Sequence, residues 1–173
     1  MKAWHLCPAE MRCWYSDRPP GGGGIRHPII VGGSLVHAKM PRLHREGLHA
    51  APRLIDALTY GNGPIVCRVE LDGEVINGGD CMAGTRRTLL WHLTSAQSLA
   101  VWREFGRWCA DLSGGAAAAV YAGAGGHWAK AKRCALHSMR EQVSAGVPYR
   151  SVKQRQDDKL AALVAAERGS NDD

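Results

Sequence analysis

The sequence lacks the features that mark several large classes of protein. No apolar run is long enough to cross a membrane, and the first residues lack the apolar core and cleavage site of a secretory signal. None of the six cysteines forms a Cys-x-x-Cys pair, and His5 with Cys7 on one strand face supplies too few ligands for zinc. These absences favour a soluble, cytoplasmic protein with reduced cysteines, no metal site and no membrane partner.

Catalytic motifs are also missing. The sequence holds no Ser-His-Asp order and no paired-carboxylate signature. The four glycines at 21–24 fit neither phosphate-loop spacing, so we expect residues 18–24 to form a surface loop. No function follows from these motifs alone.

Length and charge set wide limits. A chain of 173 residues suits one domain, or one domain with an appendage. The net charge of +6 permits contact with nucleic acid or an acidic partner but requires neither, and a solvated basic surface is the favoured explanation.

The rest of the chain is organised around residues 46–71. A short strand at 47–51 is followed by a helix at 52–60, which begins at a proline and has an apolar stripe of Leu54, Ile55 and Leu58. The Gly-Asn-Gly-Pro run at 61–64 ends the helix. A strand at 65–71 then alternates apolar and charged residues.

Turn residues predict the other strands. We expect a first strand at 1–7 and a hairpin at 25–38 that turns at Gly32-Gly33. Asp72-Gly73 predicts a turn after which 74–76 pairs back on the preceding strand, and 77–80 predicts another turn before a last strand within 81–93.

The second half of the sequence changes to helical periodicity. It predicts helices at 96–112, 116–122, 127–143 and 149–168, separated by glycine-rich breaks. Strands followed by helices indicate an α+β fold. We predict a mixed or antiparallel sheet with one packed helix in 1–93, a helical region packed on it in 94–168, and a disordered tail at 169–173.

Several blocks resemble a family of proteins encoded by tailed bacteriophages and prophages. They include 46–50 (EGLHA), 64–74 (PIVCRVELDGE), 86–91 (RRTLLW) and 154–160 (QRQDDKL). The resemblance spans most of the chain. It implies a phage or prophage origin and a location in the host cell, and it implies no activity.

The order of elements is also distantly similar to the front half of the ADP-ribosyltransferase fold. That fold carries a histidine on its first strand, a G-x-Y strand, and a helix that ends in a second tyrosine. His5, Gly47-Leu48-His49 and Tyr60 match these positions, with His49 in place of the first aromatic and ten residues between His49 and Tyr60. The resemblance implies an NAD-binding pocket made by His5, Gly47, His49 and Tyr60.

The catalytic glutamate of that fold has no clear counterpart. Glu70 and Glu74 come earlier in the chain than the resemblance implies, and Arg86 and Arg87 stand where the glutamate is expected. We take Glu70 and Arg87 as the candidate catalytic residues. An arginine suits phosphate binding, so the resemblance also leaves open an activity like that of RNA 2′-phosphotransferases, which share the fold.

Two non-catalytic readings remain open beside the transferase hypothesis. The first is an accessory protein that binds a host protein or nucleic acid through a basic helical face made by Arg133, Arg140, Arg150, Lys153 and Arg155. The second is an assembly role in which the helices form an oligomer interface. The sequence alone does not choose between these readings and an NAD-binding enzyme.

Overall fold

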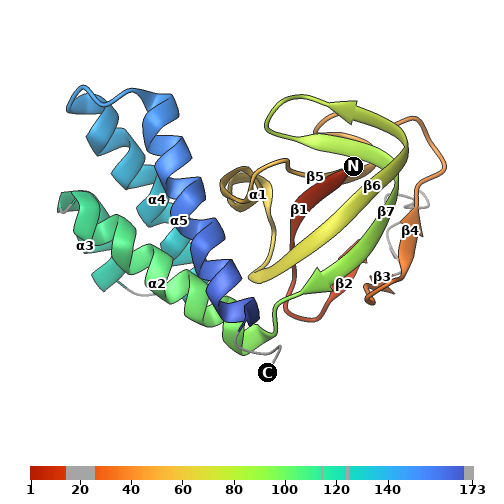
Figure 1. The fold of residues 1–173 in the computed structure, drawn as a ribbon, viewed down its shortest axis with the longest axis horizontal. Coiled ribbons are helices and arrows are strands. Elements are labelled where there is room, and N and C mark those ends of the chain that lie inside the picture. The colour runs from red at the N-terminus through yellow and green to blue at the C-terminus, as the bar shows by residue number, and fades with distance from the viewer. Residues whose placement is uncertain (15–25, 114, 124, 170–173) are drawn as a thin grey trace, which may run out of the picture. The chain divides into compact units, whose positions relative to one another are not determined.

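The protein is described here by a computed structural model, which covers residues 1–14, 26–113, 115–123 and 125–169. The chain forms two compact units, Met1–Leu93 and Thr94–Asp173. The first unit contains the strands and one helix, and the second contains helices (Figure 1). The predicted α+β class is therefore confirmed.

The first unit is built on an antiparallel sheet. Five strands are joined in it, in the order β1-β6-β7-β4, with β5 also paired to β7. A separate ribbon is made by β2 and β3. Their bounds are β1 Lys2–Cys7, β2 Arg12–Trp14, β3 Arg26–Pro28, β4 Ser34–Val36, β5 Leu48–Ala50, β6 Ile65–Asn77 and β7 Met82–His92.

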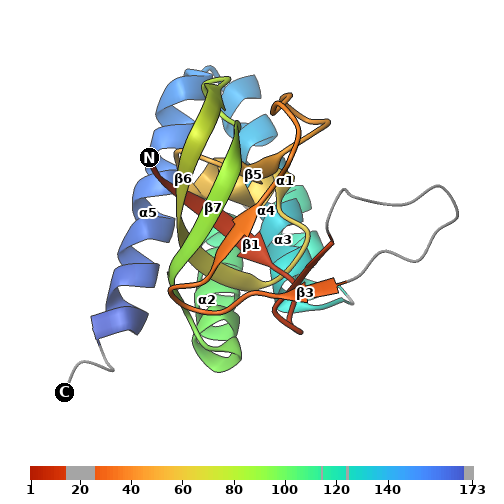
Figure 2. The ribbon, with the colours of Figure 1, turned by 90° about the vertical axis from the view of Figure 1, so that its right-hand side faces the viewer.

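The sheet curls back on itself through β5. The N–H of Trp4 donates to the carbonyl of Ala51 at 2.7 Å, and the N–H of Ala51 donates to the carbonyl of Trp4 at 2.8 Å. Because β5 is also paired to β7, the strands form a ring β1-β6-β7-β5-β1. In Figure 2, β1 lies behind the long β6–β7 hairpin. The curl encloses a common interior for side chains of all four strands.

Strand alternation fills that interior. Cys67, Val69 and Leu71 point inward from β6, and Ala3 and Cys7 point inward from β1. The opposite face of β1 is covered by helix α1, Leu54–Tyr60, which buries Leu54 and Leu58. Since His5 lies between Ala3 and Cys7 on the same strand face, the fold carries it into the interior.

Two predicted turns are wrong. The residues after Gly32-Gly33 form β4, but β4 pairs with β7, and Ile29–Val31 form no strand. At Asp72-Gly73 the strand does not reverse. It continues as β6 through an irregularity between Asp72 and Val75, with Gly73 at φ 73°. At Asp72-Gly73 the long ladder with β7 satisfies more backbone groups than a local hairpin would, and at β4 the partner is again β7 rather than the preceding residues.

The second unit contains the four predicted helices. They are α2 Ser95–Ser113, α3 Gly115–Ala122, α4 His127–Ser144 and α5 Tyr149–Gly169. Trp102, Phe105, Cys134, Leu160 and Val164 are buried in it. No helix in the described part of the chain is both long and apolar enough to span a membrane.

The cysteines match the expectation of buried thiols. Cys7, Cys67, Cys81, Cys109 and Cys134 are all buried and free. Cys7 and Cys67 are in direct contact, with 3.2 Å between their sulfur atoms. The side chain of Cys13, the predicted loop at 18–24 and residues 170–173 lie outside the described part.

Candidate functional site

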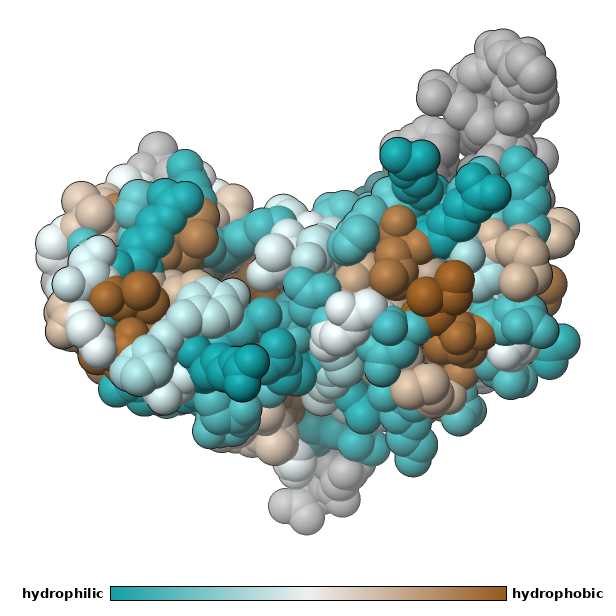
Figure 3. Space-filling view, turned by 90° about the horizontal axis from the view of Figure 1, so that it is seen from above, coloured by the Kyte–Doolittle hydropathy of each residue, from teal (hydrophilic) through white to brown (hydrophobic). Residues whose placement is uncertain are grey.

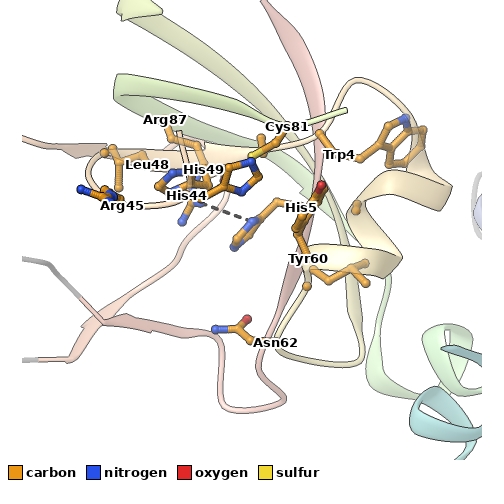
Figure 4. A pocket seen from close by; sticks show the side chains of 16 residues that line it. Trp4, His5, His44, Arg45, Leu48, His49, Tyr60, Asn62, Cys81 and Arg87 are labelled. Atoms are coloured by element: carbon orange, nitrogen blue, oxygen red, sulfur yellow. Dashed lines mark hydrogen bonds between the residues drawn. The ribbon is translucent and has the colours of Figure 1, made fainter. Parts of the chain in front are cut away.

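A cavity of about 420 Å³ opens between β1, β5 and the end of α1. It is lined by five of the six predicted site residues: His5, Gly47, His49, Tyr60 and Arg87 (Figure 4). These residues come from three strands, a loop and a helix. The curled sheet brings them together although as many as 82 positions separate them in the chain.

Arg87 lies at the inner end of the cavity and is 4% exposed. Its Nη1 donates to the backbone carbonyl of His49 at 2.7 Å and lies 3.3 Å from Nδ1 of His5. The guanidinium therefore connects β7 with both β5 and β1. It holds the two histidine-bearing strands at a fixed spacing.

The contact with Arg87 determines the form of His5. A guanidinium nitrogen can only donate, so Nδ1 of His5 accepts and the ring proton lies on Nε2. Burial, followed by the positive charge of Arg87, lowers the pKa of His5 from its ordinary value of 6.5. His5 is thus a neutral ring near pH 7, with an N–H that can donate to a ligand or to Cys7.

His49 is held by the turn that precedes it. Its Nε2 lies 3.3 Å from the carbonyl of Arg42, so this nitrogen carries the proton and donates. Burial lowers the pKa of His49 as well. Gly47 permits this arrangement because its φ is 105°, and a side chain there would crowd Pro41 and the carbonyl of Gly84.

Tyr60 lies at the outer end of the cavity and is 46% exposed. Its hydroxyl donates to Oδ2 of Asp80 at 2.7 Å, and this bond raises the pKa of Tyr60 to about 12. The bond fixes the end of α1 against the β6–β7 turn. The tyrosine ring contacts the ring of His44, with 5.2 Å between the centroids and 45° between the ring planes.

His44 was not among the predicted site residues. It lies in the turn closed by the Arg42–Glu46 bridge and has a φ of 60°. Arg45, Asn62 and Trp4 line the cavity too, and they were also missed. The basic composition of the 39–45 loop was visible in the sequence, but its position against Tyr60 depends on the folded path of the chain.

Glu70 is the predicted site residue that the structure does not bring to the cavity. It lies on β6 between the inward-pointing Val69 and Leu71, so its side chain points to the other face, where it is exposed. Its carboxylate is 4.0 Å from the terminal ammonium of Met1. Arg86 is likewise exposed and lies outside the cavity lining.

The lining of the cavity has a clear electrostatic character. Among the described residues it holds Arg45, Arg87 and three histidines, and it includes no aspartate or glutamate. The described residues form no group of three or more His, Cys, Asp or Glu side chains that could hold a metal ion. Such a lining suits an anion with an attached ring.

Comparisons with protein-family models, with curated proteins and with solved structures find no match to this chain. The resemblances to phage proteins and to the ADP-ribosyltransferase fold therefore remain predictions.

Proposed function

We propose that the first unit binds a nucleotide in the cavity between β1, β5 and α1. The observation that carries this proposal is the lining, in which two arginines, three histidines and an exposed tyrosine face one space without a carboxylate. Arginine and a histidine N–H are the usual protein partners of phosphate oxygens.

The position of each group suggests how the ligand lies. Arg87 and His5 are at the inner end, where low exposure strengthens their interaction with a phosphate. Tyr60 and His44 are at the outer end, where their rings can stack on a base or on nicotinamide. NAD and ADP, which combine phosphates with flat rings, are the first ligands to test.

If the protein is an enzyme, the same lining favours one type of transfer reaction over the other. A glutamate that stabilises an oxocarbenium ion would have to come from outside the lining, since Glu70 points away from it. Arginine and histidine side chains instead stabilise the charge on a transferred phosphate. Between the two transferase readings, the cavity favours phosphate transfer over ADP-ribose transfer. The resemblance to phage-encoded proteins supports a role in the host cell.

Isothermal titration calorimetry with ADP, NAD and inorganic phosphate tests the proposal. We expect Arg87→Met to weaken ADP binding by about tenfold to a hundredfold, because a charge-assisted hydrogen bond contributes about 1.5–3 kcal/mol. Arg86→Met is the matched control: it removes the neighbouring exposed arginine and should leave affinity unchanged.

Arg87 also bonds to the carbonyl of His49, so the fold of the variant must be checked by circular dichroism. Arg87→Lys keeps the charge and serves as a milder second variant. The proposal fails if the wild-type protein binds none of the three ligands at millimolar concentration, or if the two methionine variants lose affinity equally.

A second candidate function is nucleic-acid binding by the helical unit. Arg133 and Arg140, seven positions apart on α4, are both exposed, as is Arg150 on α5. Binding of this kind weakens steeply with salt. Fluorescence anisotropy with labelled DNA and RNA at 50 and 200 mM salt should show that loss, and an Arg133→Glu/Arg140→Glu variant should remove the binding. Binding that does not respond to salt would point to a protein partner instead.

A further inference from the structure

A second cavity lies inside the curled sheet, beside the first. Its volume is about 250 Å³, several times the roughly 30 Å³ that a water molecule occupies in the liquid. Most of its wall is apolar and includes Ile29, Leu35, Val69 and Leu89. It is large enough for a six-membered ring or a short branched chain.

The two cavities share two side chains. His5 and Arg87 line both of them, and Nη1 of Arg87 lies 3.3 Å from Nδ1 of His5. The pair therefore separates a polar compartment from an apolar one. A single anionic group held by this pair would face both compartments at once.

The second cavity offers few other polar contacts. The hydroxyl of Ser34 is already 2.7 Å from the hydroxyl of Thr88, so it has a partner within the sheet. Water inside such a space makes few hydrogen bonds, and an apolar group there replaces it favourably. The cavity thus suits an apolar substituent whose attachment point is charged.

We propose that the second cavity binds a small apolar group carried by the same phosphate that the first cavity binds. The ligand class is then a phosphate ester with a short aliphatic or aromatic substituent on one side and the nucleotide, or an equivalent polar group, on the other. This inference rests on the proposed function, because it places the phosphate at Arg87 and His5.

Calorimetry with inorganic phosphate, phenyl phosphate, benzoate and ADP tests the inference on the full chain. We expect phenyl phosphate to bind at least about tenfold more tightly than inorganic phosphate, since burying an aromatic ring gains about 25 cal/mol per Å² of apolar surface. Benzoate should bind more weakly than phenyl phosphate. If it binds as tightly, the assignment to a phosphate ester is overturned.

Leu35→Trp should fill the second cavity. Phenyl phosphate and inorganic phosphate should then bind with about equal affinity, and ADP should still bind. The matched control is Ile76→Trp, which replaces an exposed apolar residue of β6 outside both linings and should keep the preference. If Leu35→Trp does not fold, Ile30→Trp provides a second test, because Ile30 lines the cavity but is itself exposed.

The outcomes distinguish nucleotide binding in the first cavity from binding of an apolar group in the second. Wild-type protein that binds neither phosphate nor ADP overturns the proposed function and this inference together. Protein that binds ADP but shows no preference for phenyl phosphate over phosphate overturns this inference alone. So does a preference that survives both cavity-filling variants.

Discussion

Arg87 combines contacts to two other strands with a place in the lining of both cavities. Its Nη1 connects β7 to the carbonyl of His49 and to the ring of His5, and the same guanidinium lines both cavities. Arginine suits this position better than lysine because its planar fork can bond in several directions at once. A ligand that binds beside it meets a cation whose orientation is already fixed.

The two histidines beside Arg87 should make stability depend on pH. Burial lowers the pKa of both His5 and His49 below 6.5, so the unfolded chain takes up protons at a higher pH than the folded chain does. Stability is then fully present above pH 6.5 and is lost as the pH falls below that value.

Urea unfolding at pH 7.5 and pH 5.5 measures this effect. We expect the free energy of unfolding to decrease on acidification, and His5→Asn to reduce the decrease by about 1 kcal/mol in total, because only about one pH unit of this range lies below 6.5. Asparagine keeps an acceptor for Arg87, so the variant should fold. An equal pH dependence in His5→Asn and wild type would contradict the assignment.

Strand β6 contains an irregularity between Asp72 and Val75 that depends on a glycine at position 73. At Gly73 the φ is 73°, and a side chain there would collide with Oγ1 of Thr85, which accepts a hydrogen bond from the N–H of Glu74. Gly79 also has a positive φ of 90°, but no atom lies within 4 Å of where its side chain would be.

This difference predicts the outcome of two alanine substitutions. Gly79→Ala should lower the free energy of unfolding by about 1 kcal/mol, the cost of the left-handed backbone alone. Gly73→Ala should lower it by about 1 kcal/mol more, because Thr85 must also move. Urea denaturation of the two variants measures both values. Equal losses would show that Thr85 adjusts without cost.

The elements differ in how far the sequence could predict them. Periodicity located β1, α1 and the four helices of the second unit, because apolar spacing depends on neighbours along the chain. It did not predict that Ser34–Val36 pairs with Thr88–Arg86, since that ladder joins distant segments. Asp72-Gly73 carries the residues of a turn, yet the pairing of Val75 with Gly84 extends the strand beyond it.

In the site, too, contacts between distant segments could not be predicted from the sequence. His5, His49 and Tyr60 were proposed from the resemblance to the ADP-ribosyltransferase fold, and they do line one cavity. Whether the cavity binds NAD stays a prediction. His44 could not be proposed, because its contact with Tyr60 depends on the turn at Arg42–Glu46 and on the end of α1, which meet only in the folded chain.

Because the chain forms two compact units, a substitution that destabilises the helical unit should leave ligand binding by the first unit unchanged. All residues that line the two cavities belong to Met1–Leu93. Leu160→Ala, in the core of the helical unit, should therefore lower that unit's stability by about 2–5 kcal/mol and leave ADP affinity within about twofold of wild type.

Thermal unfolding followed by circular dichroism measures the loss of stability. Calorimetry at a temperature where the variant is still folded measures its affinity for ADP. Leu136→Ala is the control, because Leu136 lies on α4 of the same unit but is exposed and should cost much less stability. A large loss of ADP affinity in Leu160→Ala would show that the helical unit supports the cavity.

The two hydrogen bonds between Trp4 and Ala51 also bear on how the protein behaves at high concentration. An open sheet edge is a template on which another chain can add a strand and start aggregation. Closing the ring at β1 leaves β4 as the end of the strand order of the five-stranded sheet, and β4 is only three residues long. Apolar Ile30, Val31 and Val36 are nevertheless exposed at or beside it. Figure 3 shows that hydrophobic and hydrophilic residues are mixed on the face seen from above. Self-association, where it occurs, should begin at β4, and a charged residue at position 36 should suppress it.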